Sequence, residues 1–503
     1  MDLGYGRSHA IRRRVVGPSH LRSVHSSDLA TMNNRHPAYR RIYPAPAYYA
    51  WAMPCVATRV FNRDLGSSKV AMPRLATRDP LKPHFLLYQL DRSLFFKATG
   101  CVFNSLEVLC ILINLIRTST ILIRSANQAR FNMENMQYLS NDTIHRLLIS
   151  LTKEEIINFK ATIEQTLENY SAGEERRYQP DPNAVTRPNG ARTLFRPFTS
   201  DSSVGAKLVV EPPTKADGKK DPLRGILILL DGSGNPTGIL GAEEVTGYRT
   251  SMNVMVPFSW RKNVDNIVIF GGGMQALWHS RLILSLRGDE VKNITFISPF
   301  KDQVDTLIET ISRENATHWK SNCSFNFIRA AAESQNEIEK RLLDVDCVFC
   351  TTPSQKPLFP STYLTKRGSG SRQPFISAIG SWQSDMIELD PALLQHATVA
   401  PGGYNPLSGE SKGAVLVDDR EYALANSGEV VQSKLPARDL VEIGHILAMK
   451  SGRSANITKT QIEQTNRFIS EGFVVYKSIG VSLTDLTAGQ AVLALRQKKQ
   501  HHL

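Results

Sequence analysis

Residues 264–276 read VDNIVIFGGGMQA, and this stretch determines which fold the chain can adopt. The apolar run 264–270 predicts a buried strand, and the pattern from 274 to 286 predicts a helix. Between them lies a glycine-rich turn that fits the sequence G-x-G-x-x-A. At a junction from strand to helix, that sequence is typical of a binding site for a dinucleotide.

The turn itself supplies the features that a dinucleotide phosphate needs. Gly271 permits the tight turn, and Gly273 lets the pyrophosphate approach the backbone. Ala276 allows the helix to pack closely on the strand. The helix N-terminus, with Met274 and Gln275, offers free N–H groups and the positive end of a helix dipole. We therefore predict that these residues bind the phosphates of NADP or NAD.

The sequence after the turn alternates between strands and helices, which is typical of a doubly wound parallel sheet. The expected elements are a strand at 293–297, a helix at 301–314, a strand at 324–329, a helix at 334–344 and strands at 346–351, 374–379 and 414–418. The fold class is therefore α/β, with a Rossmann-type dinucleotide-binding domain. A glycine-rich turn with only a packing role is the alternative.

The end of the second strand bears on which nucleotide is bound. NAD-binding folds usually place a carboxylate there for the ribose 2′-hydroxyl. Here residues 297–301 read ISPFK, with no acid. A 2′-phosphate would meet no repulsion from a carboxylate, and Lys301 could partly neutralise its charge. Ser298 and Lys301 are therefore candidate cofactor residues, and NADP is favoured over NAD.

The residues before the turn predict a second region that mixes helices with strands. Thr152 and Glu155 form a capping box at the start of one of its helices. The expected elements are helices at 143–151 and 153–170, strands at 193–198, 204–211 and 225–230, a strand at 237–240 that forms a hairpin with the third, and a helix from about 243. This region is the candidate for a second domain.

Charge and composition narrow the function. The chain has 503 residues, enough for two or three domains, and a net charge of +13. Of its 60 Lys and Arg and 47 Asp and Glu, residues 1–132 contain 19 and 6, which leaves 41 of each sign. The rest of the chain is neutral, which argues against binding of nucleic acid. The six cysteines do not form a disulfide scaffold, and Cys347 and Cys350 lack a second pair of zinc ligands, so no metal site is expected.

Residues 1–132 lack a sustained period of 2 or 3.6. We expect this extension to be disordered or absent from the native chain, with Met133 or Met136 as the start. An apolar stretch at 101–123 approaches the length of a membrane span, but polar and charged residues interrupt it. We therefore expect a cytoplasmic protein without a membrane segment, although the basic N-terminus leaves organelle targeting open.

Eight short motifs make the chain from about 136 to 498 resemble the ornithine cyclodeaminase/mu-crystallin family. They are GAKLV at 205–209, VTGYRT at 245–250, the glycine turn at 271–276, TTPS at 351–354, ELDP at 388–391, VDDR at 417–420, EIG at 442–444 and YKSIG at 476–480 with DL at 485–486. The resemblance implies an NAD(P)-binding Rossmann domain at 257–472. It also implies a homodimer, with a discontinuous α/β substrate-binding and dimerisation domain built from 133–256 and 473–503.

The resemblance further implies which residues bind the substrate, a small amino or imino acid. Its carboxylate would be held by three cations, and the motifs place these at Arg187, Lys207 and Arg249. Arg192 and Arg196 lie close to the first of these in the sequence. Lys207 is also the expected general acid, with a bound water as the competing source of the proton.

Residues from two later motifs are expected to bind the cofactor, and those of the second motif are expected beside the nicotinamide. The first motif supplies Thr351 and Thr352, and the second supplies Ser478 and Gly480. Asp485 follows at the start of the last expected helix. It either fixes the loop that contains Ser478 or is an ordinary helix-start acid.

One departure from the family bears on the reaction. Cyclodeaminases have an aspartate that handles the substrate amine, and Trp382 occupies that position here, with Asp385 three residues later. Branches of the family that reduce imines or act as amino-acid dehydrogenases also lack this aspartate. We therefore expect an NAD(P)H-dependent oxidoreductase that reduces a small cyclic imino acid, or interconverts an amino acid and its oxo acid. An ornithine cyclodeaminase and a non-catalytic binder of NADPH or a small ligand are the alternatives.

Overall fold

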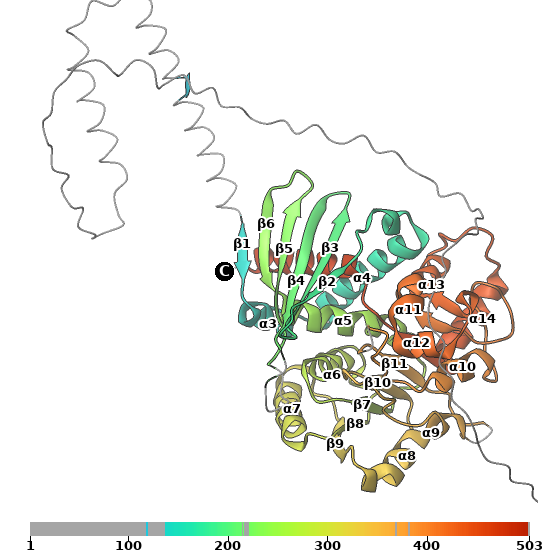
Figure 1. Cartoon of the computed structure of the whole chain (residues 1–503). Coiled ribbons are helices and arrows are strands. Elements are labelled where there is room, and N and C mark those ends of the chain that lie inside the picture. The colour runs from blue at the N-terminus through green and yellow to red at the C-terminus, as the bar shows by residue number, and fades with distance from the viewer. Residues whose placement is uncertain are drawn as a thin grey trace, which may run out of the picture. The chain divides into compact units, whose positions relative to one another are not determined.

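The computed structural model describes residues 117–118, 136–213, 215, 221–367, 370–380 and 383–500 (Figure 1). These residues all belong to one compact unit, Phe103–Leu503. The basic extension 1–132 and the apolar stretch 101–123 lie outside the described residues, apart from Arg117 and Thr118. Within the described ranges, no helix has the length and apolar character needed to cross a membrane.

The first of two sheets has six strands in the order β1-β6-β5-β4-β3-β2. The strands are β1 (Gln137–Leu139), β2 (Asn183–Thr186), β3 (Arg192–Ser200), β4 (Ser203–Glu211), β5 (Arg224–Asp231) and β6 (Pro236–Gly241). All neighbours are antiparallel except β1 and β6. The four predicted strands and the hairpin of β5 with β6 are confirmed, whereas β1 and β2 are additional.

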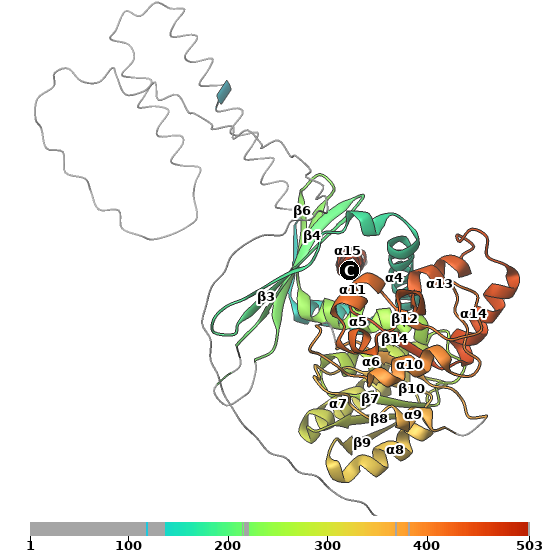
Figure 2. The same cartoon turned by 45° about the vertical axis from the view of Figure 1, so that its right-hand side comes forward.

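Helices cover one face of this sheet, as Figure 2 shows for α4, α5 and α15. The helices are α3 (Asn141–Ile149), α4 (Lys153–Ala172), α5 (Ala242–Phe258) and α15 (Ser482–Gln500). The capping box of Thr152 and Glu155 at the start of α4 is confirmed. Helix α3 begins two residues before the expected start, because Ser140 accepts the capping hydrogen bond from Thr143 N.

The second sheet has eight parallel strands in the order β13-β12-β14-β11-β10-β7-β8-β9. The strands are β7 (Asn266–Phe270), β8 (Asn293–Ser298), β9 (Ser324–Arg329), β10 (Cys347–Cys350), β11 (Phe375–Ala378), β12 (Val415–Val417), β13 (Leu440–Glu442) and β14 (Val474–Lys477). The chain turns back at β7, from which β8 and β9 extend one way and the later strands the other. This is a doubly wound α/β sheet, as the sequence predicts.

Nine helices of the described residues connect or flank these strands. They are α6 (Met274–Arg287), α7 (Lys301–Glu314), α8 (Gln335–Leu343), α9 (Thr362–Thr365), α10 (Pro391–Val399), α11 (Arg420–Asn426), α12 (Gly428–Ser433), α13 (Ile443–Lys450) and α14 (Lys459–Glu471). Helix α6 packs against α5 of the first sheet's layer. The two sheets are therefore joined through the helix that follows the glycine turn.

The expected domain boundary at 472/473 comes too early. Strand β14 pairs with β11 on one side and β12 on the other, so it belongs to the eight-stranded sheet. Its residues are all buried, which suits a central strand with both faces covered. Only the following helix, α15, returns to the first sheet, where it packs on α4, α5 and β3. The chain changes layer between Ser478 and Ser482.

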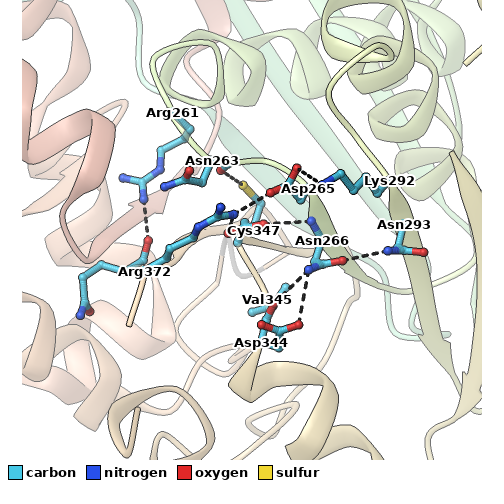
Figure 3. Close-up of polar contacts among 12 residues, drawn as sticks. Arg261, Asn263, Asp265, Asn266, Lys292, Asn293, Asp344, Val345, Cys347 and Arg372 are labelled. Carbon is cyan, nitrogen blue, oxygen red and sulfur yellow. Dashed lines mark hydrogen bonds and ion pairs between the residues drawn. The ribbon is translucent and has the colours of Figure 1, made fainter. Parts of the chain in front are cut away.

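A polar network holds together the amino ends of the parallel strands (Figure 3). Asn266 N donates to Asp346 Oδ2 at 3.0 Å, and Asn293 Nδ2 donates to Asn266 Oδ1 at 2.9 Å. Arg372 Nη1 donates to Asp265 Oδ2 at 2.6 Å. The side chains at this edge bind one another. In doubly wound sheets the ligand binds at the opposite edge, outside the carboxyl ends of the strands.

Candidate active site

The glycine turn after β7 has the backbone that a dinucleotide site requires. Gly271 has a φ of +114°, and its N–H donates to the carbonyl of Ile297 at 2.9 Å. A Cβ at Gly271 would lie 2.6 Å from Thr351 Oγ1. That hydroxyl is fixed, because it donates to the carbonyl of Phe270 at 2.7 Å. Both the positive φ and the close approach therefore require glycine at this position.

The N-terminus of α6 is open beyond this turn. Gly273 is the N-cap residue, and no side chain of the described residues caps the helix. Gly273 and Met274 are exposed, whereas Ala276 is fully buried against the sheet. Uncapped N–H groups at the positive end of a helix dipole bind phosphate. The residues predicted from G-x-G-x-x-A thus fit a nucleotide diphosphate.

Two glycine variants separate the fold of the turn from its ligand. A Cβ on Gly273 would meet nothing closer than Gln303 Nε2 at 3.8 Å, so Gly273→Ala should change stability by at most about 1 kcal/mol. The new methyl group would occupy the phosphate position, so the Kd for NADPH should rise by roughly tenfold or more. Gly271→Ala should instead lower stability, because φ is positive there. Thermal melts and fluorescence titration with NADPH check both, and unchanged affinity in Gly273→Ala would argue against this phosphate site.

A buried cluster of charges lies on the inner face of the first sheet. Lys207 on β4 and Arg249 on α5 are each 3% exposed, and Asp485 on α15 is fully buried. Lys207 Nζ lies 2.8 Å from Asp485 Oδ2, and Arg249 Nε donates to Asp485 Oδ1 at 2.7 Å. The two cations predicted as substrate ligands are therefore side by side. Arg249 Nη1 is buried without a hydrogen-bond partner among the described residues, so it is available to a ligand.

The burial of this cluster changes its protonation. Burial lowers the pKa of Lys207 to about 7, with Arg249 adding to the shift while Asp485 opposes it. Burial alone would raise the pKa of Asp485, but Arg249 and Lys207 hold it at about 2. Asp485 is thus a carboxylate at neutral pH. Lys207 can gain or release a proton near pH 7, as a general acid must.

A single residue connects this cluster with the glycine turn. Lys207 Nζ donates to Thr246 Oγ1 at 3.4 Å, and Gln275 Nε2 contacts the carbonyl oxygen of Thr246 at 3.5 Å. Gly247, the next residue, packs so closely that a Cβ would lie 2.5 Å from Trp278. Helices α5 and α6 therefore hold the cations beside the nucleotide turn.

The loop after β14 is fixed by Asp418 and not by Asp485. Asp418 is fully buried and accepts hydrogen bonds from Ser478 Oγ at 2.7 Å, Ile479 N at 2.9 Å and Gly480 N at 2.8 Å. Asp485 does lie in the first turn of α15, as one of the two expectations had it, and there it is the counter-ion of Lys207 and Arg249. The fixed loop brings Gly480, with a φ of +88°, against the cluster.

The loops after β10 and β11 are tied together by a buried carboxylate. Glu388 accepts hydrogen bonds from Thr352 N and Gly380 N, each at 2.6 Å. Thr352 Oγ1 donates to the same carboxylate at 3.2 Å. Thr351, which covers Gly271, precedes this contact. The sequence marks Glu388 only as part of a motif, but the structure shows that it fixes Thr352, one of the predicted cofactor residues.

The end of β8 has no carboxylate, as the sequence indicates. Ser298 is buried, and its Oγ accepts a hydrogen bond from Phe300 N at 3.2 Å. Lys301 Nζ pairs with Asp305 at 2.5 Å on the surface. Arg329 ends the neighbouring strand β9, where it is exposed in register with Ser298. Two cations thus lie near the expected ribose position, and sequence analysis had found only Lys301.

Arg187 does not join the buried cations. It is exposed in the turn between β2 and β3, where its backbone N–H donates to Ala191 O at 2.8 Å. Arg196 takes the place beside the cluster instead, since it pairs in register with Lys207 across β3 and β4. Residues paired across strands point to the same face of a sheet. Without this register, the sequence alone could not decide which of Arg187, Arg192 and Arg196 lies beside Lys207.

Three other predictions concern residues near the site. Trp382 lies outside the described residues. Asp385 is exposed and accepts a hydrogen bond from Gln355 Nε2 at 3.2 Å, so the described contacts do not bring it to Lys207. Cys347 and Cys350 are buried free thiols in β10, as the sequence predicts. Among the described residues, no group of His, Cys, Asp and Glu could hold a metal ion.

A cavity of about 330 Å³ lies beyond the carboxyl ends of β14 and β12. Its lining includes Arg196, Gly480 and Ser482, together with Arg176 and Tyr422. The strand order runs β8-β7-β10-β11-β14-β12 along this edge. The ribose acid of such folds follows the second strand, here β8, so a dinucleotide bound in the same way would extend its nicotinamide toward β10 and β11. The cavity lies beyond β11 in this strand order, at β14 and β12.

Comparisons with known proteins agree with this arrangement. No protein-family model matches the chain. An uncharacterized cyclodeaminase of Dictyostelium discoideum is 26% identical over 59% of this chain and 77% of its own. A Δ1-pyrroline-2-carboxylate reductase of Colwellia psychrerythraea is 22% identical over 59% of this chain and 81% of its own.

A solved structure extends the comparison to the fold. The Δ1-pyrroline-2-carboxylate reductase of Thermococcus litoralis, in complex with NADH and L-proline, has a TM-score of 0.54 at 15% identity. The match covers 72% of this chain and 98% of that one. The sheet order, the glycine turn and the named relatives all agree with one family. Over this segment, the chain resembles the ornithine cyclodeaminase/mu-crystallin family.

Proposed function

We propose that this protein is an NAD(P)H-dependent oxidoreductase that reduces the C=N bond of a small 2-imino acid, either a cyclic ketimine or the imine of an oxo acid. The observation that supports this most is the position of Thr246, which contacts Lys207 of the cation cluster and Gln275 of the nucleotide turn. A carboxylate bound by the cluster would place its α-carbon near the nicotinamide. The two relatives named as a cyclodeaminase and a reductase fit this chemistry.

The cluster suits the binding of an α-carboxylate. Arg249 Nη1 offers a buried donor without a partner among the described residues, and Lys207 lies on the other side of Asp485. Asp485 holds both side chains in place, so little conformational freedom is lost when the ligand arrives. Bonds between charged groups in such a site are short and strong.

Reduction adds a hydride to the imine carbon and a proton to the nitrogen. The dinucleotide, when bound, supplies the hydride. The nitrogen must be protonated, and Lys207 is the buried acid nearest to the carboxylate position. After the transfer, Lys207 is neutral and regains its proton from solvent. A water held in the same place is the alternative donor.

The pKa of Lys207 predicts how the rate depends on pH. The lysine is protonated below about pH 7, so kcat/KM for Δ1-piperideine-2-carboxylate should fall about tenfold per pH unit above that value. In Lys207→Arg the positive charge remains but does not titrate. The variant should be less active, and its kcat/KM should no longer fall above pH 7. A fall above pH 7 that persists in the variant would belong to the substrate and would contradict the role of Lys207.

We also infer that NADPH is preferred over NADH. The end of β8 has no acid among the described residues, and Lys301 and Arg329 lie near the expected 2′-position. Fluorescence titration should give a lower Kd for NADPH, and the double change Lys301→Ala and Arg329→Ala should remove the difference. Tighter binding of NADH by the wild type would refute this preference.

A substrate panel tests the reaction against its two alternatives. Oxidation of NAD(P)H by cyclic ketimines, or by 2-oxo acids with ammonia, is the expected result. Formation of proline and ammonia from L-ornithine, with no net change in cofactor absorbance, would identify a cyclodeaminase. Binding of NADPH with no turnover on either panel would identify a non-catalytic binder.

The protein is further proposed to be a homodimer that uses the outer face of the first sheet. Cross-strand rows on this face are mostly apolar, although Asn183, Thr193, Thr199 and Arg224 also lie in them. The apolar residues are Tyr138, Phe195, Pro197, Val204, Ala206, Leu208, Val210, Ile226, Ile228, Leu230 and Ile239. Several are exposed, including Phe195 at 41% and Val210 at 45%. An apolar patch of this extent is typical of an interface, and a second copy offers the same surface.

Two isoleucine variants test the dimer. Ile226 lies on this face and is 38% exposed, whereas Ile157 lies on α4 and is 45% exposed. Light scattering of the full chain should give twice the 56.0 kDa mass of one chain. Ile226→Glu should yield the monomer mass, and Ile157→Glu should keep the dimer. A monomeric wild type, or a dimer that survives Ile226→Glu, would disprove the proposed interface.

A further inference from the structure

Arg196 is a third cation beside the cluster, and it has no carboxylate partner among the described residues. Its Nε donates to Ser482 Oγ at 3.3 Å, and its Nη2 donates to the carbonyl of Gly480. Its Nη1 and Arg249 Nη1 approach the same point, since a Cβ on Gly480 would lie 3.5 and 3.2 Å from them. Both hydrogen-bond partners of Arg196 are neutral, so no carboxylate of the described residues pairs with it directly.

The ion pairs of the site leave Arg196 available to a second anion. Among the described residues, Lys207 and Arg249 form ion pairs with Asp485, whereas Arg196 forms none. The other buried carboxylate nearby, Asp418, accepts its hydrogen bonds from Ser478, Ile479 and Gly480. An α-carboxylate bound by Lys207 and Arg249 would compensate one further charge. Arg196 would still face the site as a cation. Arg196 is half-buried at the wall of a cavity, so a negative group that enters beside it would gain a charged hydrogen-bond partner.

The cavity at Arg196 can hold such a group. Its volume of about 330 Å³ lies within the range of small-molecule sites. Two of its acids are engaged elsewhere or point outward. Asp419 accepts from Tyr170 Oη and lies 3.6 Å from Arg176 Nη1, while the Glu421 side chain is 76% exposed. Asp181, the third acid, is exposed at the rim.

The cavity lies on the side of the site into which a substrate side chain would extend. The nicotinamide is expected near β10 and β11, and the α-carboxylate beside Lys207 and Arg249. The cavity opens past them, along β14 and β12, with Arg196 at the boundary. A substrate side chain that extends from the α-carbon in the direction away from the nicotinamide would therefore reach into the cavity within a few bonds.

We propose that Arg196 binds a second carboxylate, at the end of the substrate's side chain, so that the protein prefers acidic 2-imino acids to neutral or basic ones. This inference rests on the proposed reduction of imino acids and specifies its substrate class. The second carboxylate takes no part in bond changes. It gives Arg196 an anionic partner and fixes the orientation of the α-carbon.

The test compares substrates of similar length with and without the second charge. The imine formed from 2-oxoglutarate and ammonia should be reduced with a kcat/KM at least tenfold above that formed from 2-oxohexanoate and ammonia. L-Glutamate should likewise inhibit Δ1-piperideine-2-carboxylate reduction more strongly than L-norleucine. The inhibition assay works even where free ammonia is a poor substrate.

Variants of Arg196 connect the preference with this side chain. Arg196→Met should lower the ratio of acidic to neutral kcat/KM by roughly 10- to 100-fold, which is the usual effect of losing a hydrogen bond between charged groups. Arg196→Lys should restore part of that ratio. A role confined to holding Gly480 would lower both rates equally and leave the ratio unchanged, which would overturn the inference. Arg177→Met, on an exposed arginine paired with Glu174, is the control and should change neither rate.

The two proposals fail in different ways. No oxidation of NAD(P)H with any substrate would refute the reduction of imino acids itself. Turnover of neutral ketimines with no preference for acidic ones would leave the reaction standing and overturn the role of Arg196. A preference for basic imino acids would do the same, and would assign the cavity to Asp181 and Glu421 at its rim.

Discussion

Arg249→Ala is expected to lower kcat/KM for imine reduction by on the order of a thousandfold, while the Kd for NADPH changes by less than about threefold. Arg249 is 3% exposed, and its Nη1 has no hydrogen-bond partner among the described residues. Losing its charge leaves the substrate carboxylate with Lys207 alone. The glycine turn is a separate element, on α6, so nucleotide binding should be spared.

Lys207→Ala should have a similar effect on turnover for the same reason. Arg249→Lys should recover part of the activity, because a positive charge remains near Asp485. Arg146→Ala, at the exposed end of α3, serves as the control and should change neither quantity. Steady-state kinetics and fluorescence titration on the same samples give both numbers. Loss of NADPH binding together with turnover would show that the cluster does not act on the substrate.

Asp485→Asn is expected to lower the free energy of unfolding by about 3–5 kcal/mol, the usual result of removing one partner from a buried set of charges. Asp485 is fully buried, and it is the carboxylate that pairs with both Lys207 and Arg249. Its removal leaves two buried cations without compensation. Asp142→Asn, in the exposed first turn of α3, should cost less than about 1 kcal/mol. Urea denaturation of the three proteins gives the comparison.

The stabilities of the wild type and Asp485→Asn should depend differently on pH in the acid range. The pKa of Asp485 is held at about 2, below that of an aspartate in the unfolded chain. Its contribution to stability is therefore complete above about pH 4 and is lost as the pH falls toward 2. The difference in unfolding free energy between wild type and Asp485→Asn should narrow over that range. A difference that stays constant with pH would show that the loss comes from packing and not from charge.

Much of the fold could be predicted because its strands are strongly patterned. The run 264–270 with its glycine turn, and the alternation after it, specify the parallel sheet. Strand β2 was missed because its four residues are all exposed and show no alternation. Strand β14 was found but given to the wrong sheet. A short apolar strand can belong to either sheet, and only its pairing with β11 and β12 assigns it to the eight-stranded one.

The site could be predicted where a residue stands out within its own segment. Lys207 interrupts an apolar strand, and the glycine turn has a known spacing. Arg196, Asp418 and Asp485 could not be assigned, because their roles depend on contacts across 60 to 286 positions of the chain. Register across β3 and β4 chooses Arg196 over its neighbours.

A crystal structure with NADP⁺ and pyrrole-2-carboxylate, a planar analogue that cannot be reduced, tests the central claim most directly. We predict that the diphosphate lies on the N–H groups between Gly271 and Ala276, and that the carboxylate lies on Arg249 and Lys207. The nicotinamide C4 should then lie about 3–3.5 Å from the ring carbon that bears the carboxylate. A nucleotide bound away from the glycine turn, or a carboxylate bound elsewhere than the cluster, would contradict the account.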